Sequence, residues 1–204
     1  FAFVGVFHQQ TINKKMKKIT LIVTLILSTT MLAQTNQELP YYQLPEASET
    51  FTAGTVAARQ VDALGFRFYH ATDGLTEKDL AYKPTDSVRT TQETIDHIYD
   101  LSKIVLNSTL KKTNNREEVD MTFEAKRAAT LNNLKQAADI LRSSEDISQF
   151  KIIFGERDIS FWNNINGPIA DAIWHCGQIA SFRRVTGNPI NPKVNHFSGT
   201  VKKD

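Results

Sequence analysis

One apolar segment near the C-terminus limits the folds that this chain can adopt. It covers about residues 168–185, and its side chains are apolar or small on nearly every side when they are placed on a helix. Gly167-Pro168 suits a helix start with proline in the first helical position, and Gly187 marks the end. A helix of this kind packs among other elements, so we expect it to be the most buried helix of a bundle. Gly177 within it is expected to let a neighbouring helix approach closely.

Three further segments have helical periodicity, and no alternating pattern typical of strands is long enough to compete with them. They cover about residues 48–71, 91–110 and 122–144, where apolar residues recur at every third or fourth position. Between them we expect a polar loop over residues 111–120, and after them an irregular segment over residues 145–166. Four helices in about 150 residues predict an all-α fold, a four-helix bundle.

The domain organisation expected from these patterns is a single domain that contains the bundle over residues 48–186. Residues 34–47 are expected to be an N-terminal linker, and residues 187–204 a polar C-terminal tail. Thr90 or Thr91 is the expected N-cap of the second helix, because a threonine side chain can accept a hydrogen bond from the first free backbone N–H groups.

An export signal is expected ahead of this domain. Two lysines after Met16 are followed by an uncharged apolar run to Leu32 and then by Ala33, the pattern of a signal peptide over residues 16–33. The run of about 14 residues is shorter than the roughly 20 that span a bilayer, so no stable membrane span is expected after cleavage. The alternative is an uncleaved membrane anchor. Residues 1–15 lack a starting methionine and are interpreted as upstream translation, and the mature protein is expected to be periplasmic or secreted.

The charge balance argues against a nucleic-acid partner. The full chain has 24 basic and 22 acidic residues. Removal of residues 1–33 takes away four lysines and no acidic residue, which leaves fewer basic residues than acidic ones. The remaining lysines and arginines are scattered along the chain and form no basic cluster, so no electrostatic attraction to nucleic acid is expected.

Several other residues have simple interpretations. Cys176 is the single cysteine of the sequence, which excludes an intrachain disulfide, and its place in an apolar helix favours a small buried hydrophobe over a reactive thiol. His70 ends a helix, where a cation suits the dipole, and His196 lies in the polar tail. Arg183 and Arg184 end the last helix and are interpreted as partners of its dipole and of solvent, with anion binding as the alternative.

Three polar residues interrupt the apolar C-terminal helix. At 100° per residue, Asp171, His175 and Gln178 fall within about 60° of one another. On a helix this apolar the stripe should face the core, where an unpaired carboxylate is costly and needs a cation or strong hydrogen-bond donors. His97 raises the same question on the second helix, because apolar residues surround it on its face.

Two facing helices that each offer ligands form the arrangement that metal sites in bundle cores use. The imidazoles of His97 and His175 and the carboxylate of Asp171 would hold one divalent ion by three ligands and leave a position open for water or substrate. Zinc, nickel, iron(II) and manganese are all compatible with this set. Gln178, about one turn beyond His175, could orient a ligand or the bound water.

Simpler interpretations of the same residues stay open. His97 could be a core histidine with an ordinary hydrogen-bond partner. Asp171 could be stabilised by the free N–H groups in the first turn of its helix, and His175 could hydrogen-bond Asp171. The rival function is then a metal-free binding or interaction protein in which Asp171, His175 and Gln178 form a buried hydrogen-bond network, and which forms a homodimer or holds an apolar ligand.

Three motifs of the chain are similar to those of one known family. Residues 75–84, LTEKDLAYKP, look like that family's segment between its first two helices, and residues 94–99, TIDHIY, look like its second-helix histidine motif. Residues 171–179, DAIWHCGQI, are similar to its final-helix motif. Together they resemble the DinB-like, or YfiT-like, superfamily of four-helix bundles with a metal site, and the resemblance spans about residues 48–185.

This resemblance implies three metal ligands, which fall on His97, Asp171 and His175. Asp171 stands where the family has the first histidine of its final pair, a change that favours harder ions or marks a site that has lost its metal. Some relatives are thiol-dependent transferases or isomerases, a chemistry that does not fit an exported protein. The expectation is an exported bundle that binds one divalent metal and acts as a metal-dependent hydrolase or group transferase on a small molecule.

Overall fold

A computed structural model describes residues 38–115 and 119–203 of the chain. The expected upstream residues 1–15 and signal peptide 16–33 lie outside the described residues, as does the first part of the expected linker. Among the helices that are described, none is both long and apolar enough to cross a membrane.

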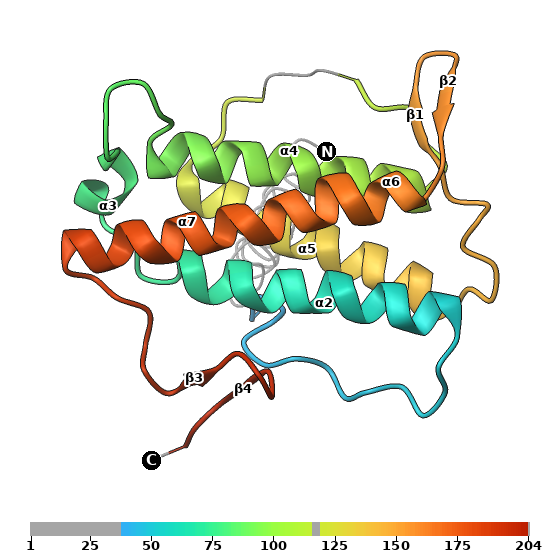
Figure 1. Ribbon diagram of the computed structural model, residues 1–204, viewed down its shortest axis with the longest axis horizontal. Coiled ribbons are helices and arrows are strands. Elements are labelled where there is room, and N and C mark those ends of the chain that lie inside the picture. The colour runs from blue at the N-terminus through green and yellow to red at the C-terminus, as the bar shows by residue number, and fades with distance from the viewer. Residues whose placement is uncertain (1–37, 116–118, 204) are drawn as a thin grey trace, which may run out of the picture. The chain divides into compact units, whose positions relative to one another are not determined.

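The chain is mostly helical, as the sequence predicts, and two short hairpins accompany the helices (Figure 1). In chain order the elements are α2 (Ala53–Thr72), α3 (Glu77–Ala81), α4 (Thr91–Thr109), α5 (Phe123–Arg142), β1 (Ile152–Phe154), β2 (Arg157–Ile159), α6 (Trp162–Asn164), η1 (Ile165–Ile169), α7 (Ala170–Thr186), β3 (Val194–Asn195) and β4 (Thr200–Val201).

Threonine side chains begin the long helices α2, α4 and α5. The side chain of Thr52 accepts a hydrogen bond from the backbone of Thr55, and Thr122 caps α5 in the same way. At α4 the Thr90 side chain accepts from the Glu93 N–H group while the Glu93 carboxylate accepts from the Thr90 N–H group, which is a capping box. The N-cap predicted at Thr90 or Thr91 is therefore Thr90, and the helix starts at Thr91.

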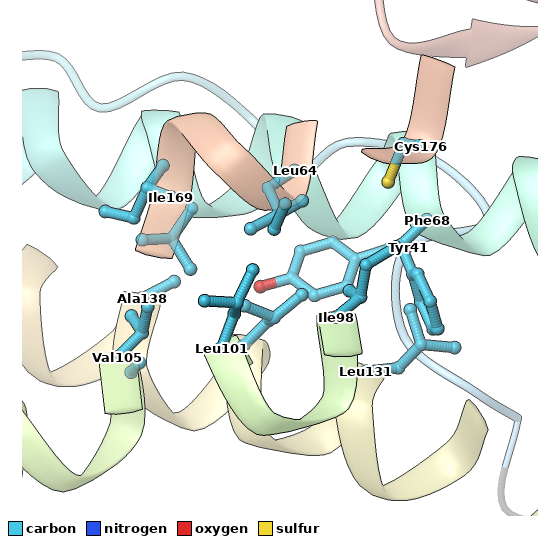
Figure 2. Packing of buried hydrophobic residues seen from close by; sticks show 14 of the residues in the cluster. Tyr41, Leu64, Phe68, Ile98, Leu101, Val105, Leu131, Ala138, Ile169 and Cys176 are labelled. Carbon is cyan, nitrogen blue, oxygen red and sulfur yellow. The ribbon is translucent and has the colours of Figure 1, made fainter. Parts of the chain in front are cut away.

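The four long helices among the described residues pack in pairs. Helices α2 and α4 each lie against both α5 and α7. Figure 1 shows that α4 and α5 run in the same direction, and that α2 and α7 run in the opposite one. Apolar side chains from all four helices meet between them, and Figure 2 shows how closely they lie; among them are Leu64, Ile98, Leu131 and Cys176. Each large buried side chain stabilises the fold by about 1.5–3 kcal/mol.

The start of α2 touches the end of α5 through Gly54. A Cβ atom at this position would lie 2.0 Å from the carbonyl oxygen of Ser144 and 2.3 Å from that of Leu141. Both neighbours are backbone atoms, which cannot rotate away as a flexible side chain can. Only glycine lets the two helices come this close.

Part of the segment expected as a linker packs into the core. The ring of Tyr41 is 4% exposed and lies against Gly65, where a Cβ atom would be 2.4 Å from the ring. The Tyr41 hydroxyl donates to Asp62 over 3.1 Å, and the guanidinium of Arg142 donates to the same carboxylate over 3.0 Å. Burial raises the pKa of Asp62 while Arg142 opposes that shift. This segment therefore anchors the face of α2.

The C-terminal helix differs from the prediction in its start. Helical backbone begins at Trp162 in α6 and continues through the π-helix η1 into α7, with Pro168 inside the π-helical turn. Ile169 has helical angles of φ −73° and ψ −52°, so no helix end separates η1 from α7. The expectation that Pro168 is the first helical residue is therefore wrong. A π-turn carries proline more easily than an α-turn because its hydrogen-bond pattern is already shifted.

The expectation that this helix is the most buried one is also wrong. Helix α7 buries one stripe, Ala172, Cys176, Ile179 and Arg183, at intervals of three or four residues. Trp174 on the same helix is 75% exposed. The apolar residues are spread around the helix, but only this one stripe is buried, so composition alone overstated its burial.

Gly177 lies on an open part of α7. Among the described residues, no heavy atom other than those of its chain neighbours and its own helix backbone lies within 4 Å of the position where its Cβ would be. The expected close approach of another helix at Gly177 is therefore wrong, and the close approach occurs at Gly54 instead.

Residues 145–166, predicted to be irregular, contain an antiparallel hairpin. Strands β1 and β2 pair through Ile152–Ile159 and Phe154–Arg157, and the two-residue loop begins at Gly155, whose φ is +57°. Glycine readily adopts positive φ at the first residue of a two-residue loop, so Gly155 in the sequence is compatible with this turn. The N–H group of Asn114 donates to the Ile153 carbonyl over 2.8 Å and holds the hairpin beside the end of α4.

The C-terminal tail folds back onto α2. Strands β3 and β4 pair, Val201 is buried, and the Leu44 N–H group donates to the Gly199 carbonyl over 2.8 Å. Helix α7 ends at Gly187, which has φ of +88° and the left-handed conformation that favours glycine. The residues predicted to form a polar tail are thus folded and pack together with the rest of the described residues.

Candidate metal centre

His97, Asp171 and His175 lie together where α4 and α7 pack. His97 Nε2 is 3.1 Å from Asp171 Oδ2, and His175 Nε2 is 3.4 Å from Asp171 Oδ1. The two imidazole rings are 4.9 Å apart between centroids and nearly perpendicular, at 83°. The three residues predicted from sequence are therefore one cluster, and both imidazoles present the same nitrogen to one carboxylate.

Helix geometry explains how α7 contributes two of these residues. Asp171 and His175 are four positions apart, which places their side chains on the same face one turn apart. His97 comes from the facing helix α4. Since backbone hydrogen bonds fix both helices, the cluster depends on packing between α4 and α7 and on no loop.

The spacing of the donor atoms can be compared with that of a metal site. Each of the three residues offers one ligand atom, and these atoms lie within 4.8 Å of one another, so together they could hold a metal ion. Two ligands at about 2.0–2.1 Å from one ion are at most roughly 4.2 Å apart. Ligation therefore requires the widest pair to close by several tenths of an ångström, which a small rotation of an imidazole or carboxylate provides.

The cluster lies at the edge of the core. The side chains of His97, Asp171 and His175 are 29%, 42% and 14% exposed. Gln178 is exposed, and Phe182 packs edge-on against Tyr82. The expectation that this stripe faces the core is wrong, because the face of α7 that packs against other helices is the stripe of Ala172, Cys176, Ile179 and Arg183. Because the three side chains are partly exposed, a small molecule can reach the cluster from solvent.

Gln178 contacts His175, as the sequence suggested. His175 Nδ1 lies 2.5 Å from Gln178 Oε1. An amide oxygen only accepts hydrogen bonds, so Nδ1 carries the proton. In neutral His175 the lone pair then lies on Nε2, which faces the negatively charged carboxylate of Asp171. A cation between the two groups would make this contact favourable.

A groove of about 840 Å³ opens beside Asp171. Its walls come from α4, the β1–β2 hairpin, η1 and α7. Among its lining residues are Phe154, Arg157 and Trp174, which the sequence analysis did not single out. The signal that could have found the hairpin is Gly155 directly after the apolar run Ile152–Phe154, because glycine starts a tight two-residue loop.

Of the described residues, the other two histidines, His70 and His196, do not join the cluster. His70 is buried, with Nε2 3.0 Å from the Tyr42 carbonyl, and burial lowers the pKa of its ring. The expected role of His70 as a cation at a helix end is therefore wrong. His196 stacks edge-on against Phe66, at 5.7 Å between ring centroids.

Arg183 and Cys176 have structural roles. Arg183 is buried and donates to the carbonyls of His70 and Ala71, so it caps the end of α2 instead of facing solvent. Cys176 is 3% exposed, and burial raises the pKa of its thiol to about 12. The prediction of a small buried hydrophobe at Cys176 is confirmed.

Comparisons of the chain with protein-family models, with curated proteins and with solved structures find no match.

Proposed function

We propose that this protein binds one divalent metal ion through His97, Asp171 and His175 in a four-helix bundle of the DinB-like kind. The single observation that carries the proposal is the arrangement of His175. Its Nδ1–H group donates to Oε1 of Gln178. Its Nε2 and the Nε2 of His97 both point at the carboxylate of Asp171. Metal-bound histidines donate their other ring N–H group in this way, which fixes the ring and its tautomer.

The position of Asp171 also favours a cation. A carboxylate in the first turn of an isolated helix is stabilised by free N–H groups and the helix dipole. Here helical backbone continues before α7 through η1 and α6, so the N–H groups near Asp171 are not at a free helix end. The charge of Asp171 is therefore left to the imidazoles and to whatever they bind.

Two imidazoles and one carboxylate suit zinc, nickel, iron(II) or manganese. Such an ion supplies a Lewis acid that polarises a bound group and lowers the pKa of a bound water. The chain contributes a fixed ligand triangle, the Gln178 contact that orients His175, and the groove beside Asp171. These features support a metal-dependent hydrolase or group transferase that acts on a small molecule.

A metal-free binding protein is the second candidate. In that case His97 donates from Nε2 to Asp171, His175 donates from Nδ1 to Gln178, and Nε2 of His175 lies beside the Asp171 carboxylate. Each polar group then has a partner, as the rival interpretation requires, although Gln178 is exposed and not buried. In this interpretation the protein forms a homodimer or holds an apolar ligand.

Elemental analysis of the purified protein separates these candidates. We expect about one first-row metal ion per chain after incubation with zinc and gel filtration, and loss of that ion in His97→Ala. His196→Ala is the matched control, because His196 lies on a different face of the protein, against Phe66. Absence of bound zinc, nickel, iron and manganese in the unmodified protein would refute the metal centre.

We also propose export through residues 16–33, supported by the lysine pair, apolar run and Ala33 described above. The expected result is a protein outside the cytoplasm of a bacterial host whose mass corresponds to a start near Gln34. Leu25→Arg should block export by breaking the apolar run. Retention of Met16 in the exported protein, or persistent attachment to the membrane, would contradict this proposal.

A further inference from the structure

The groove beside Asp171 has one wall made by a single face of the β1–β2 hairpin. Ile152 pairs with Ile159, and Phe154 pairs with Arg157. Directly paired residues in antiparallel strands project to the same face. All four of these residues line the groove, while the alternate residues Ile153 and Asp158 do not. The hairpin thus presents three apolar side chains and one guanidinium to the groove.

The opposite wall is also apolar. Leu101 and Ile104 on α4 and Trp174 on α7 line it. Trp174 is 75% exposed and Phe154 is 44% exposed, although both are large and apolar. Both line the groove, and exposed aromatic side chains on a concave surface contribute little to folding but bind apolar parts of small molecules.

Arg157 supplies the charge of this groove. It is exposed, and among the described residues no carboxylate lies within ion-pair distance of it. Asp171 is the acidic residue of the lining, and its carboxylate faces the two imidazoles. An unpaired guanidinium beside apolar walls recognises a carboxylate or a similar planar anion by two parallel hydrogen bonds.

We propose that this groove binds a small molecule with an apolar body and an anionic end group, which pairs with Arg157. The apolar body lies between Phe154 and Trp174, and the other end of the molecule reaches the cluster at Asp171. This names a substrate class for the metal centre and, for the reacting end, rests on the proposed function. The anion site itself depends only on the hairpin and α7.

The π-helix η1 is an independent feature of the same place. Asn166, Gly167 and Pro168 of this element line the groove, directly before the helix that carries Asp171. Single π-turns inside helices occur frequently at functional sites, because they shift a helix face without breaking it. The irregular helix, the hairpin face and the candidate ligand Asp171 therefore converge on one groove.

Fluorescence of Trp174 tests the proposal. Trp162 is exposed and is not part of the groove lining, so Trp162→Phe leaves Trp174 as the only tryptophan. In this background we would titrate 4-phenylbutanoate and its neutral analogue 4-phenylbutanamide, with the protein either loaded with zinc or treated with EDTA. We expect the anion to bind at least about tenfold more tightly than the amide in both forms, which corresponds to about 1.4 kcal/mol.

Arg157→Gln should remove this preference and leave weak, equal binding of the two probes, whereas Arg157→Lys should retain part of it. Lys151→Gln is the matched control: it removes one positive charge next to the hairpin but outside the groove lining, and the preference should persist. Thermal unfolding of each variant checks that the fold is intact. Equal binding of both probes by the unmodified groove, or a preference that survives Arg157→Gln, would overturn the inference.

The two proposals fail in different ways. Binding of 4-phenylbutanoate only to the zinc form, without an effect of Arg157→Gln, would mean that the carboxylate binds the metal; the centre would then stand and the anion site would be refuted. An Arg157-dependent preference in a protein that retains no metal would support the anion site and refute the centre.

Discussion

His97 Nε2 lies 3.1 Å from Asp171 Oδ2, although 74 residues separate the two in sequence. This contact joins α4 to α7 at the point where the groove reaches the cluster. Because both residues are on helices, the contact reports how the two helices are packed and is not a property of a flexible loop.

Asp171→Ala should weaken zinc binding strongly, whereas Asp171→His should preserve or strengthen it. The alanine removes one of three ligands, and we expect a loss of about 100-fold or more, above the 10–100-fold that changes around a ligand cost. The histidine supplies an imidazole one turn before His175. Competition with a chromogenic chelator measures both affinities. Full zinc affinity in Asp171→Ala would show that the carboxylate is not a ligand.

Gln178→Leu should reduce zinc affinity by about 10–100-fold without changing the free energy of unfolding of the metal-free protein. The reason is that Gln178 holds His175 with its Nε2 towards Asp171 while its own side chain is exposed. Ser181→Ala, an exposed change on the same helix, is the control and should leave affinity unaltered. Equal affinity in both variants would contradict a role for the amide in orienting His175.

Asp79→Asn should destabilise the protein at neutral pH, and by a smaller amount once the pH falls below about 4. The buried carboxylate of Asp79 accepts hydrogen bonds from Thr76, Thr186 and Asn188. Although burial raises its pKa, these bonds outweigh that effect and hold the pKa well below its usual range. Its stabilisation is therefore complete above the unfolded-state pKa of about 4 and is lost as pH falls towards the lower folded-state pKa.

Urea unfolding of wild type and Asp79→Asn at pH 7 and pH 3 measures this difference. At pH 7 we expect a cost of about 1–3 kcal/mol, because a charge-assisted network is replaced by a neutral one. The difference should shrink at pH 3. A difference of the same size at both pH values would show that the charge of Asp79 is not the stabilising feature.

Two glycine-to-alanine changes should act in opposite directions. Gly54→Ala places a methyl group against two backbone carbonyls at the α2–α5 contact and should cost about 1–3 kcal/mol or more. Gly177→Ala adds a methyl group in open space within α7 and should stabilise by about 0.5–1 kcal/mol. Thermal unfolding of the two variants gives both signs. Destabilisation by Gly177→Ala would place an unseen neighbour at α7.

Features that depend on local chemistry could be predicted from the sequence. Thr90 and Glu93 specify a helix start by their own side chains, and Asp171 and His175 share a face because of helical spacing alone. Their meeting with His97 was foreseen because polar residues on otherwise apolar faces need partners.

Features that depend on packing between distant segments were not predictable in this way. The apolar composition of α7 indicated burial, but Trp174 is exposed because other helices cover only one stripe of α7. The hairpin that carries Arg157 was missed because its strands are three residues long, too short for an alternating pattern to register.

The place of Tyr41 bears on where a stable fragment of this protein should begin. Its ring occupies the space that Gly65 leaves by having no side chain, and its hydroxyl satisfies Asp62 beside Arg142. A fragment trimmed to the helices, beginning at Thr52, would keep a glycine with nothing against it and a buried carboxylate one hydrogen bond short. We therefore expect such a fragment to be less stable than one that includes the residues ahead of α2, and those residues belong in any fragment used to study the helices.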